Sequence, residues 1–203
     1  MNVLLTSVGR RVELLKDFRQ SMRRSGLPGK IVTADFKKSA PASFLADTAE
    51  LVPRVSDPSY IDRLLEICQQ HSIELLVPLI DTELHLLSLH RQRFAEIGTR
   101  LLISSAETND ICYSKKKTGE FFSKIGVKTP KVYQLSEITD TNFPLILKPD
   151  TGSSSVGLHY VENRKELDFL ANYVEGAIFQ ELIEGEEYTI DALLDFNGKA
   201  ISI

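Results

Sequence analysis

The chain has 203 residues, of which 42% are hydrophobic and 26% charged, and its formal net charge is -4. This composition is typical of a globular protein with one large or two small cores, and the negative charge argues against a broad nucleic-acid-binding surface. No apolar run approaches the roughly 20 residues that a membrane helix needs, and the N-terminus lacks the apolar core of a signal peptide. We therefore expect a cytoplasmic protein without a membrane partner.

Strand and helix patterns alternate in the first hundred residues. Apolar runs predict strands over residues 3–5, 31–34, 75–78 and 101–103. Apolar residues at helical spacing predict helices over residues 10–24, 60–70 and 82–97. Strands and helices that alternate with short connections indicate an α/β fold, a Rossmann-like parallel sheet covered on both faces.

The pattern changes after residues 104–112. Two short helices are expected over residues 108–113 and 114–125, and a further helix is expected over residues 164–174. The predicted strands are those around Tyr133 and over residues 145–147, 158–161, 178–182, 188–194 and 199–203. Asn197 and Gly198 form a strong two-residue hairpin turn before the last of these strands. We therefore divide the chain into domains 1–106 and 107–203. Because the last strand has no closing helix after it, we expect the second domain to be truncated.

Lys148 lies at the end of an apolar run and is followed at once by a Gly- and Ser-rich loop, residues 151–157. Glycine lets successive backbone N–H groups point at one spot, and the hydroxyls of Ser153, Ser154 and Ser155 add small donors. A lysine beside such a loop is suited to holding a polyphosphate. Lys148 could instead be an edge-strand lysine that deters aggregation, but the Gly/Ser loop directly after it favours phosphate contact.

Two further segments stand in a fixed order around Lys148. Lys115 lies at the start of a predicted helix, and residues 179–190 read Phe-Gln-Glu-Leu-Ile-Glu-Gly-Glu-Glu-Tyr-Thr-Ile. In this order and spacing the chain resembles the ATP-grasp superfamily, and within it the carbamoyl-phosphate synthase large-subunit-like proteins. Residues 5–11 (Leu-Thr-Ser-Val-Gly-Arg-Arg) and 78–83 (Pro-Leu-Ile-Asp-Thr-Glu) are similar to the N-terminal domain of that subgroup.

This resemblance implies a Rossmann-like preATP-grasp domain followed by a partial (α+β) ATP-grasp domain, comprising a lid and the start of a larger subdomain. It implies that Lys115 reaches the nucleotide from the first helix of the lid and that Lys148 contacts the phosphates. The three serines would then fall in the mobile loop that folds over the phosphates.

The resemblance also assigns roles to the segment after the second lysine. Gln180, Glu181, Leu182 and Ile183 match the hinge, where backbone groups read the adenine edge. Glu187 matches the acid that accepts hydrogen bonds from the ribose hydroxyls. Many family members carry an acid at the position of Gln180, whose side-chain carbonyl can accept the same hydrogen bond from the adenine amino group.

The implied activity is that of an ATP-dependent ligase, which activates a carboxylate as an acyl phosphate for attack by an amine or a similar nucleophile. ATP and Mg²⁺ would be the cofactors, with metal ligands beyond Ile203, and a small carboxylate and an amine-type acceptor would be the partners. An oligomer is compatible with the sequence.

The sequence leaves alternatives open. A nucleotide-binding module or fragment without catalysis is one, and an NAD(P) protein is disfavoured because no GxGxxG is present. Asp81, Thr82 and Glu83 follow the third predicted strand, where they could face the acceptor or cap the next helix.

Overall fold

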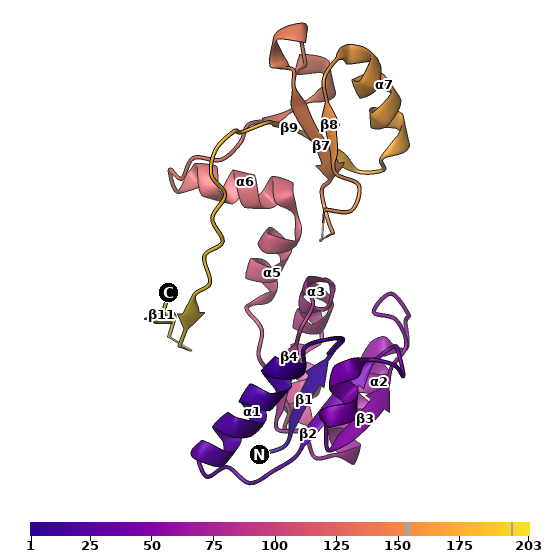
Figure 1. Cartoon of the computed structure of the whole chain (residues 1–203), viewed down its shortest axis with the longest axis vertical. Coiled ribbons are helices and arrows are strands. Elements are labelled where there is room, and N and C mark those ends of the chain that lie inside the picture. The colour runs from indigo at the N-terminus through magenta and orange to yellow at the C-terminus, as the bar shows by residue number, and fades with distance from the viewer. Residues whose placement is uncertain (153–154, 196) are drawn as a thin grey trace.

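A computed structural model describes residues 1–152, 155–195 and 197–203. Two sheets lie at opposite ends of an elongated molecule, and helices α5 (Ala106–Tyr113) and α6 (Lys115–Lys124) run between them (Figure 1). Within the described ranges, we find no helix with the length and apolarity that a bilayer-spanning segment requires.

The first sheet is entirely parallel, as the alternating sequence pattern predicts. Its order is β3-β2-β1-β4-β5. The strands are β1 (Val3–Thr6), β2 (Ile31–Asp35), β3 (Thr48–Leu51), β4 (Leu75–Pro78) and β5 (Arg100–Leu101). From β1 the chain continues to β2 and then to β3 at one edge of the sheet, whereas from β4 it continues to β5 at the other edge. The direction of winding therefore reverses between β1 and β4.

Helices cover both faces of this sheet, which explains why successive residues of the central strand are apolar. On one face, Leu15 packs with Val3 and Leu5 of β1, and on the other, Leu64 packs with Leu4. The first face is covered by α1 (Val12–Arg24) and the short 3-10 helix η1 (Pro41–Leu45). The second is covered by α2 (Tyr60–Gln70), α3 (Asp81–Leu89) and α4 (Arg91–Glu96). We call residues 3–101 the parallel-sheet unit.

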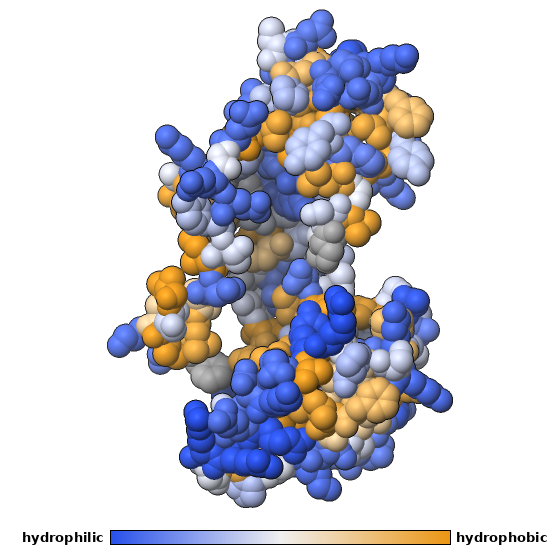
Figure 2. Space-filling view, in the orientation of Figure 1, coloured by the Kyte–Doolittle hydropathy of each residue, from blue (hydrophilic) through white to orange (hydrophobic). Residues whose placement is uncertain are grey.

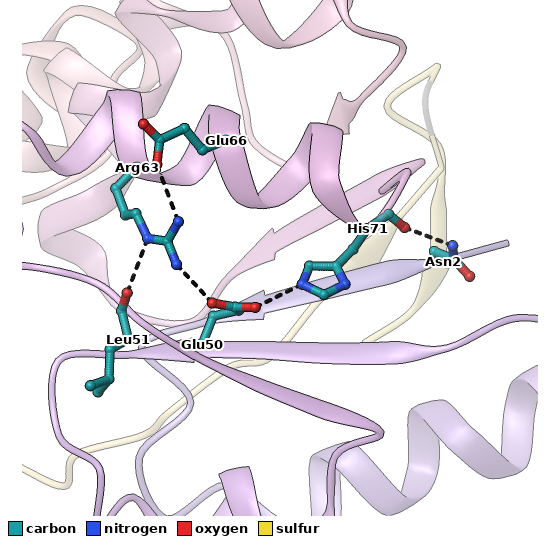
Figure 3. Close-up of polar contacts among 6 residues, drawn as sticks. All are labelled: Asn2, Glu50, Leu51, Arg63, Glu66 and His71. Carbon is teal, nitrogen blue, oxygen red and sulfur yellow. Dashed lines mark hydrogen bonds and ion pairs between the residues drawn. The ribbon is translucent and has the colours of Figure 1, made fainter.

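Strand β3 at the edge of the sheet was not predicted from the sequence. Its residues alternate between half-buried and exposed, so no apolar run marks it. Polar contacts hold the strand instead: Glu50 accepts a hydrogen bond from Arg63 at 2.7 Å, and its other oxygen lies 2.8 Å from Nε2 of His71 (Figure 3). Because both partners come from α2 and its C-terminus, this strand depends on a tertiary contact.

The helix predicted over residues 82–97 is two helices. A turn at His90 separates α3 from α4: the His90 N–H donates to the carbonyl of Leu87, and the Arg93 N–H donates to the carbonyl of His90. After the turn, Phe94 is fully buried in the core. Apolar spacing continues across the break, and no glycine or proline marks it, which is why the pattern predicted one helix. The strand predicted over 101–103 is likewise shifted to Arg100–Leu101.

The second sheet is antiparallel, with the order β6-β9-β7-β8. Its strands are β6 (Val132–Tyr133), β7 (Leu145–Pro149), β8 (His159–Val161) and β9 (Ala177–Glu181). Helix α7 (Arg164–Tyr173) covers one face, where Leu167 packs with Leu145 and Leu147. Short 3-10 helices, η2 (Leu135–Glu137) and η3 (Asp140–Asn142), precede β7. We call residues 132–181 the antiparallel-sheet unit. Its antiparallel strands with a helix on one face confirm the predicted α+β architecture of the second half.

The chain ends in a hairpin of β10 (Leu193–Leu194) and β11 (Ala200–Ser202). Gly198 has a positive φ of 81°. The Gly198 N–H donates to the Asp195 carbonyl and the Asp195 N–H donates to the Lys199 carbonyl, so the turn is longer than the predicted two-residue Asn-Gly turn. The strand predicted over 188–194 is wrong for 188–192, which form no regular element and pair with no sheet. The hairpin's apolar side chains, such as Leu193 and Ile201, are exposed and form the orange patch at the left of Figure 2.

Candidate functional site

Lys148 points away from the core of the antiparallel-sheet unit. Side chains alternate along β7, so Leu145 and Leu147 pack under α7 while Ile146 and Lys148 lie on the opposite face. The lysine is half-buried, and this burial, together with the positive charge of Lys115, lowers its pKa. A polyanion bound near these two ammonium groups would favour the charged form of Lys148.

Lys115 reaches from α6 to the end of β7. It is the first residue of the helix, and its Nζ donates to the carbonyls of Pro149, Asp150 and Gly152 at 3.0, 3.2 and 3.3 Å. The two lysines that the sequence singled out thus come together from elements more than thirty residues apart in the chain. Their binding of a nucleotide remains a prediction.

Asp150 fixes α6 to this strand, a role that the sequence did not reveal. Its carboxylate accepts hydrogen bonds from the Lys116 N–H at 2.8 Å and from the Ser114 hydroxyl at 2.7 Å, and its carbonyl accepts from the Lys115 N–H at 3.0 Å. A negative charge at a helix N-terminus is stabilising. The Ser-Lys-Lys-Lys sequence marks the N-cap, but nothing in it identifies a partner far along the chain.

The loop after β7 has the backbone conformations expected of its glycines. Gly152, Ser155 and Gly157 have φ values of 101°, 56° and 74°. A side chain at residue 157 would place its Cβ only 3.0 Å from Cγ of Pro149, so glycine permits the close approach of the loop to the strand. Ser153 and Ser154 lie outside the described residues.

Gln180 lies on the same face as Lys148. Gln180 pairs with Ile146 in β7 and with Val132 in β6. Lys148 pairs with Ile178, which lies two residues before Gln180 in the same strand and therefore on the same face. Glu181 joins β9 to the chain before β6: its N–H donates to the Lys131 carbonyl at 2.8 Å, and its carboxylate accepts from the Lys131 N–H at 3.1 Å. These groups are therefore occupied within the protein.

The remaining predicted hinge residues follow the end of β9. Leu182 is half-buried, Ile183 is exposed, and both begin the irregular segment 182–192. Glu187 is exposed in that segment, and within the described ranges no hydrogen bond or ion pair links it to another residue. The structure thus brings Lys115, Lys148 and Gln180 to one region and gives no contact that ties Glu187 to them.

The donors in this region suit ATP better than they suit a metal. Two ammonium groups and a loop of left-handed residues offer positive charge and N–H groups for phosphate oxygens. For Mg²⁺, by contrast, no group of three or more His, Cys, Asp or Glu side chains that could hold a metal occurs in residues 1–152, 155–195 and 197–203. No chemical step is therefore assigned to a metal held by these residues.

A separate cavity of about 1000 Å³ lies in the parallel-sheet unit, at the carboxyl ends of β1, β2, β3 and β4. This is the edge where open α/β sheets bind ligands, next to the point where the winding reverses. Asp35 shapes its wall, accepting hydrogen bonds from the N–H groups of Gly9 and Lys37, both at 2.9 Å. The residues after four different strands thus form one hollow.

Beside the cavity, Glu83 is fully buried and accepts hydrogen bonds from the hydroxyls of Thr6 and Ser7. Burial raises the pKa of its carboxyl group. Ser7, which lines the cavity, has a left-handed φ of 47°, so this carboxyl group supports a strained turn after β1. The sequence left open whether Asp81, Thr82 and Glu83 face a ligand or cap the next helix. In the structure Glu83 supports the turn after β1 and Thr82 lines the cavity. The N-cap of α3 has no side-chain hydrogen bond.

Comparison with known proteins gives a match for each half of the chain. The PylC-like N-terminal domain family matches residues 3–102, and an ATP-grasp domain family matches residues 112–202. D-alanine–D-alanine ligase of Fusobacterium nucleatum is 32% identical over 107 residues, which is 53% of this chain and 36% of the relative. Carbamoyl-phosphate synthase of Methanobrevibacter smithii is 25% identical over 168 residues, covering 78% of this chain and 44% of that protein.

A solved structure supports the same fold. The biotin carboxylase domain of Hydrogenobacter thermophilus 2-oxoglutarate carboxylase, in complex with MgADP, ADP and bicarbonate, superposes with a TM-score of 0.65 at 16% identity. The superposition covers 88% of this chain and 43% of that one. The chain thus spans less than half the length of each of these proteins. Two family matches that follow each other along most of the sequence, with the matching fold, show that the chain belongs to the ATP-grasp superfamily.

Proposed function

We propose that this chain is the nucleotide-binding part of an ATP-dependent ligase that joins a small carboxylate to an amine or similar nucleophile. Its relatives include a D-alanine–D-alanine ligase, and the structurally similar biotin carboxylase domain binds MgADP. We further propose residues 1–106 and 107–203 as its domains, MgATP as its cofactor and the cytoplasm as its location. An acyl phosphate would be the activated form of the carboxylate.

The observation that carries this proposal is the convergence of Lys115 and Lys148. The Lys115 ammonium donates to the carbonyls of Pro149, Asp150 and Gly152, which closely follow Lys148 in the chain, and burial together with the Lys115 charge lowers the pKa of Lys148. ATP carries about four negative charges, so two lysines from different elements would offset repulsion among its phosphates. Lysine is also a flexible point charge, suited to following a phosphate that moves during transfer.

Other predicted residues would complete the nucleotide site. Gln180 shares the face of Lys148, and Leu182 and Ile183 follow it with apolar side chains suited to an adenine ring. Lys115 now holds three carbonyls, so it would either exchange one of them for a phosphate oxygen or act by orienting the loop. Ser153, Ser154 and Ser155 would add donors, and Glu187 would reach the ribose only if segment 182–192 moved onto the sheet.

Calorimetric titration of the full chain with MgATP and MgGTP tests the proposal. We expect the wild type to bind MgATP in preference to MgGTP and Lys148→Met to weaken MgATP binding at least about tenfold, since it removes a charge-assisted contact. Lys124→Met, at the exposed end of α6, is the matched control and should leave the affinity unchanged. No MgATP binding by the wild type, or equal binding by Lys148→Met, would refute it.

A nucleotide-binding module without catalysis is the second candidate, favoured by the lack of a metal-binding cluster among the described residues. Measuring ADP release across a panel of carboxylates and amines separates the two functions. MgATP binding with no turnover for any pair, in a protein that includes the remaining length of its relatives, would favour the module.

A further inference from the structure

Apolar packing holds helix α6 only weakly. The structure describes every residue of this helix, and none of them is buried. Its two aromatic residues, Phe121 and Phe122, are 42% and 36% exposed. Helices in proteins are usually held by the packing of one apolar face, so the position of α6 depends mainly on its polar contacts.

Asp150 supplies the polar contacts between α6 and the antiparallel-sheet unit. Its carboxylate accepts hydrogen bonds from the Ser114 hydroxyl and the Lys116 N–H, and its carbonyl accepts one from the Lys115 N–H. Ser114 is buried and Asp150 is half-buried, so water competes little for these bonds. A single residue directly after β7 thus binds three donors at the start of α6.

Lys115 completes this connection in the opposite direction. Its ammonium donates to the carbonyls of Pro149, Asp150 and Gly152. Asp150 therefore holds the start of the helix, while the first side chain of the helix holds the loop that follows Lys148. Because both sets of bonds join the same two segments, loss of Asp150 should also displace the Lys115 ammonium.

The contribution of Asp150 to a phosphate site is its geometry and not its charge. A carboxylate close to bound phosphates repels them. Both oxygens of this carboxylate accept from uncharged donors, the Ser114 hydroxyl and the Lys116 N–H. A neutral side chain of the same shape could therefore keep the acceptor at the helix N-terminus without the repulsion.

We propose that Asp150 is a positioning residue of the nucleotide site. It fixes the first turn of α6 to the end of β7, and this contact keeps the Lys115 ammonium beside the strand that carries Lys148. Asp150 does not touch the nucleotide and acts through Lys115. This deepens the proposed function and rests on it, because the effect is measured as affinity for MgATP.

A double-mutant cycle, measured by calorimetric titration with MgATP, tests this role. We expect Asp150→Ala to weaken binding about fivefold and Lys115→Met to weaken it about tenfold. The variant that carries both changes should bind no more weakly than Lys115→Met alone, because Asp150 acts through that lysine. A residue that only supported the fold would weaken binding independently of Lys115, so the losses would multiply to about fiftyfold.

Two further variants separate geometry from charge and from stability. Asp150→Asn keeps an acceptor oxygen for the Lys116 N–H and should bind MgATP at least as tightly as the wild type. Asn163→Ala removes the side chain that accepts from the Glu166 N–H at the start of α7. It is the matched control, since it costs a helix cap in the same unit and should leave the affinity unchanged. Thermal unfolding checks the folding of each variant, and Ser114→Ala, which removes one of the three donors, replaces Asp150→Ala in the cycle if that variant does not fold.

Three outcomes would overturn the role of Asp150. They are an unchanged affinity in Asp150→Ala, losses that multiply in the double variant, and an equal loss in Asp150→Asn and Asp150→Ala, which would mean that the charge matters and not the position. The wild type separates this proposal from the proposed function. MgATP binding by the wild type together with any of these results rejects only the positioning role, whereas no MgATP binding by the wild type rejects both.

Discussion

The two sheets of this molecule differ in how much apolar surface they bury. In the parallel-sheet unit, Val3, Leu4 and Leu5 are 0% exposed between clusters on both faces, whereas the antiparallel-sheet unit has one cluster, beneath α7. Among the described residues of the C-terminal hairpin no apolar side chain is buried, and Leu193 is 59% exposed. The cavity therefore lies at the end of a sheet that is buried on both faces, while the position of Lys115 beside Lys148 depends on a few polar contacts between α6 and the end of β7.

The largest expected effect comes from the central strand. Leu4→Ala should lower the free energy of unfolding by about 4 kcal/mol, because it leaves a void among fully buried neighbours. Leu193→Ala in the hairpin should change it by less than about 0.5 kcal/mol. Urea denaturation measures both. Equal losses would mean that the hairpin is covered by apolar contacts in solution and would break the comparison.

Glu83 tests the buried polar contacts of the parallel-sheet unit. Glu83→Ala should cost about 3 kcal/mol of unfolding free energy, since the buried hydroxyl of Thr6 and the neighbouring hydroxyl of Ser7 lose their acceptor. Glu83→Gln retains one acceptor oxygen and should cost less. A loss below about 0.5 kcal/mol in Glu83→Ala would show that these hydroxyls find other partners.

The same residue predicts a pH dependence. Burial raises the pKa of Glu83 above the ordinary 4.5, so between these two values the folded state binds more protons than the unfolded chain. The free energy of unfolding should therefore fall as pH rises through that interval, by up to about 1.4 kcal/mol per pH unit. Glu83→Gln should lack this component. Parallel stability curves for wild type and variant from pH 4.5 upward would contradict the assignment.

The smallest effect on the free energy of unfolding is expected at the contact between α6 and the end of β7. Asp150→Ala should cost about 1 kcal/mol, because it removes the acceptor for the Lys116 N–H at the start of α6. Hydrogen exchange of that amide should accelerate, while exchange in β1 stays unchanged. Asp191→Ala, on the irregular segment, is the control and should alter neither. Unaltered exchange at Lys116 would show that α6 is fixed to the sheet by other contacts.

Much of the fold could be predicted from the sequence because it follows local apolar periodicity. The runs at residues 3–5 and 75–78 and the stripe at 60–70 all become the expected elements, and the hairpin expected around Asn197 and Gly198 forms, although through a longer turn. Strand β3 escaped prediction because polar contacts from Arg63 and His71 hold it, not an apolar run. The break at His90 also lacks a local signal.

By itself, the sequence determined which residues are candidates for a phosphate site, since Lys115, Lys148 and the glycines follow from residue type and order. Only the tertiary structure decided that Asp150 joins α6 to β7 and that the buried Glu83 accepts hydrogen bonds from Thr6 and Ser7 after β1. The physical reason is range. Periodicity and turn preferences act over a few residues, whereas hydrogen-bond pairing and desolvation depend on groups that meet only after the sheets have formed.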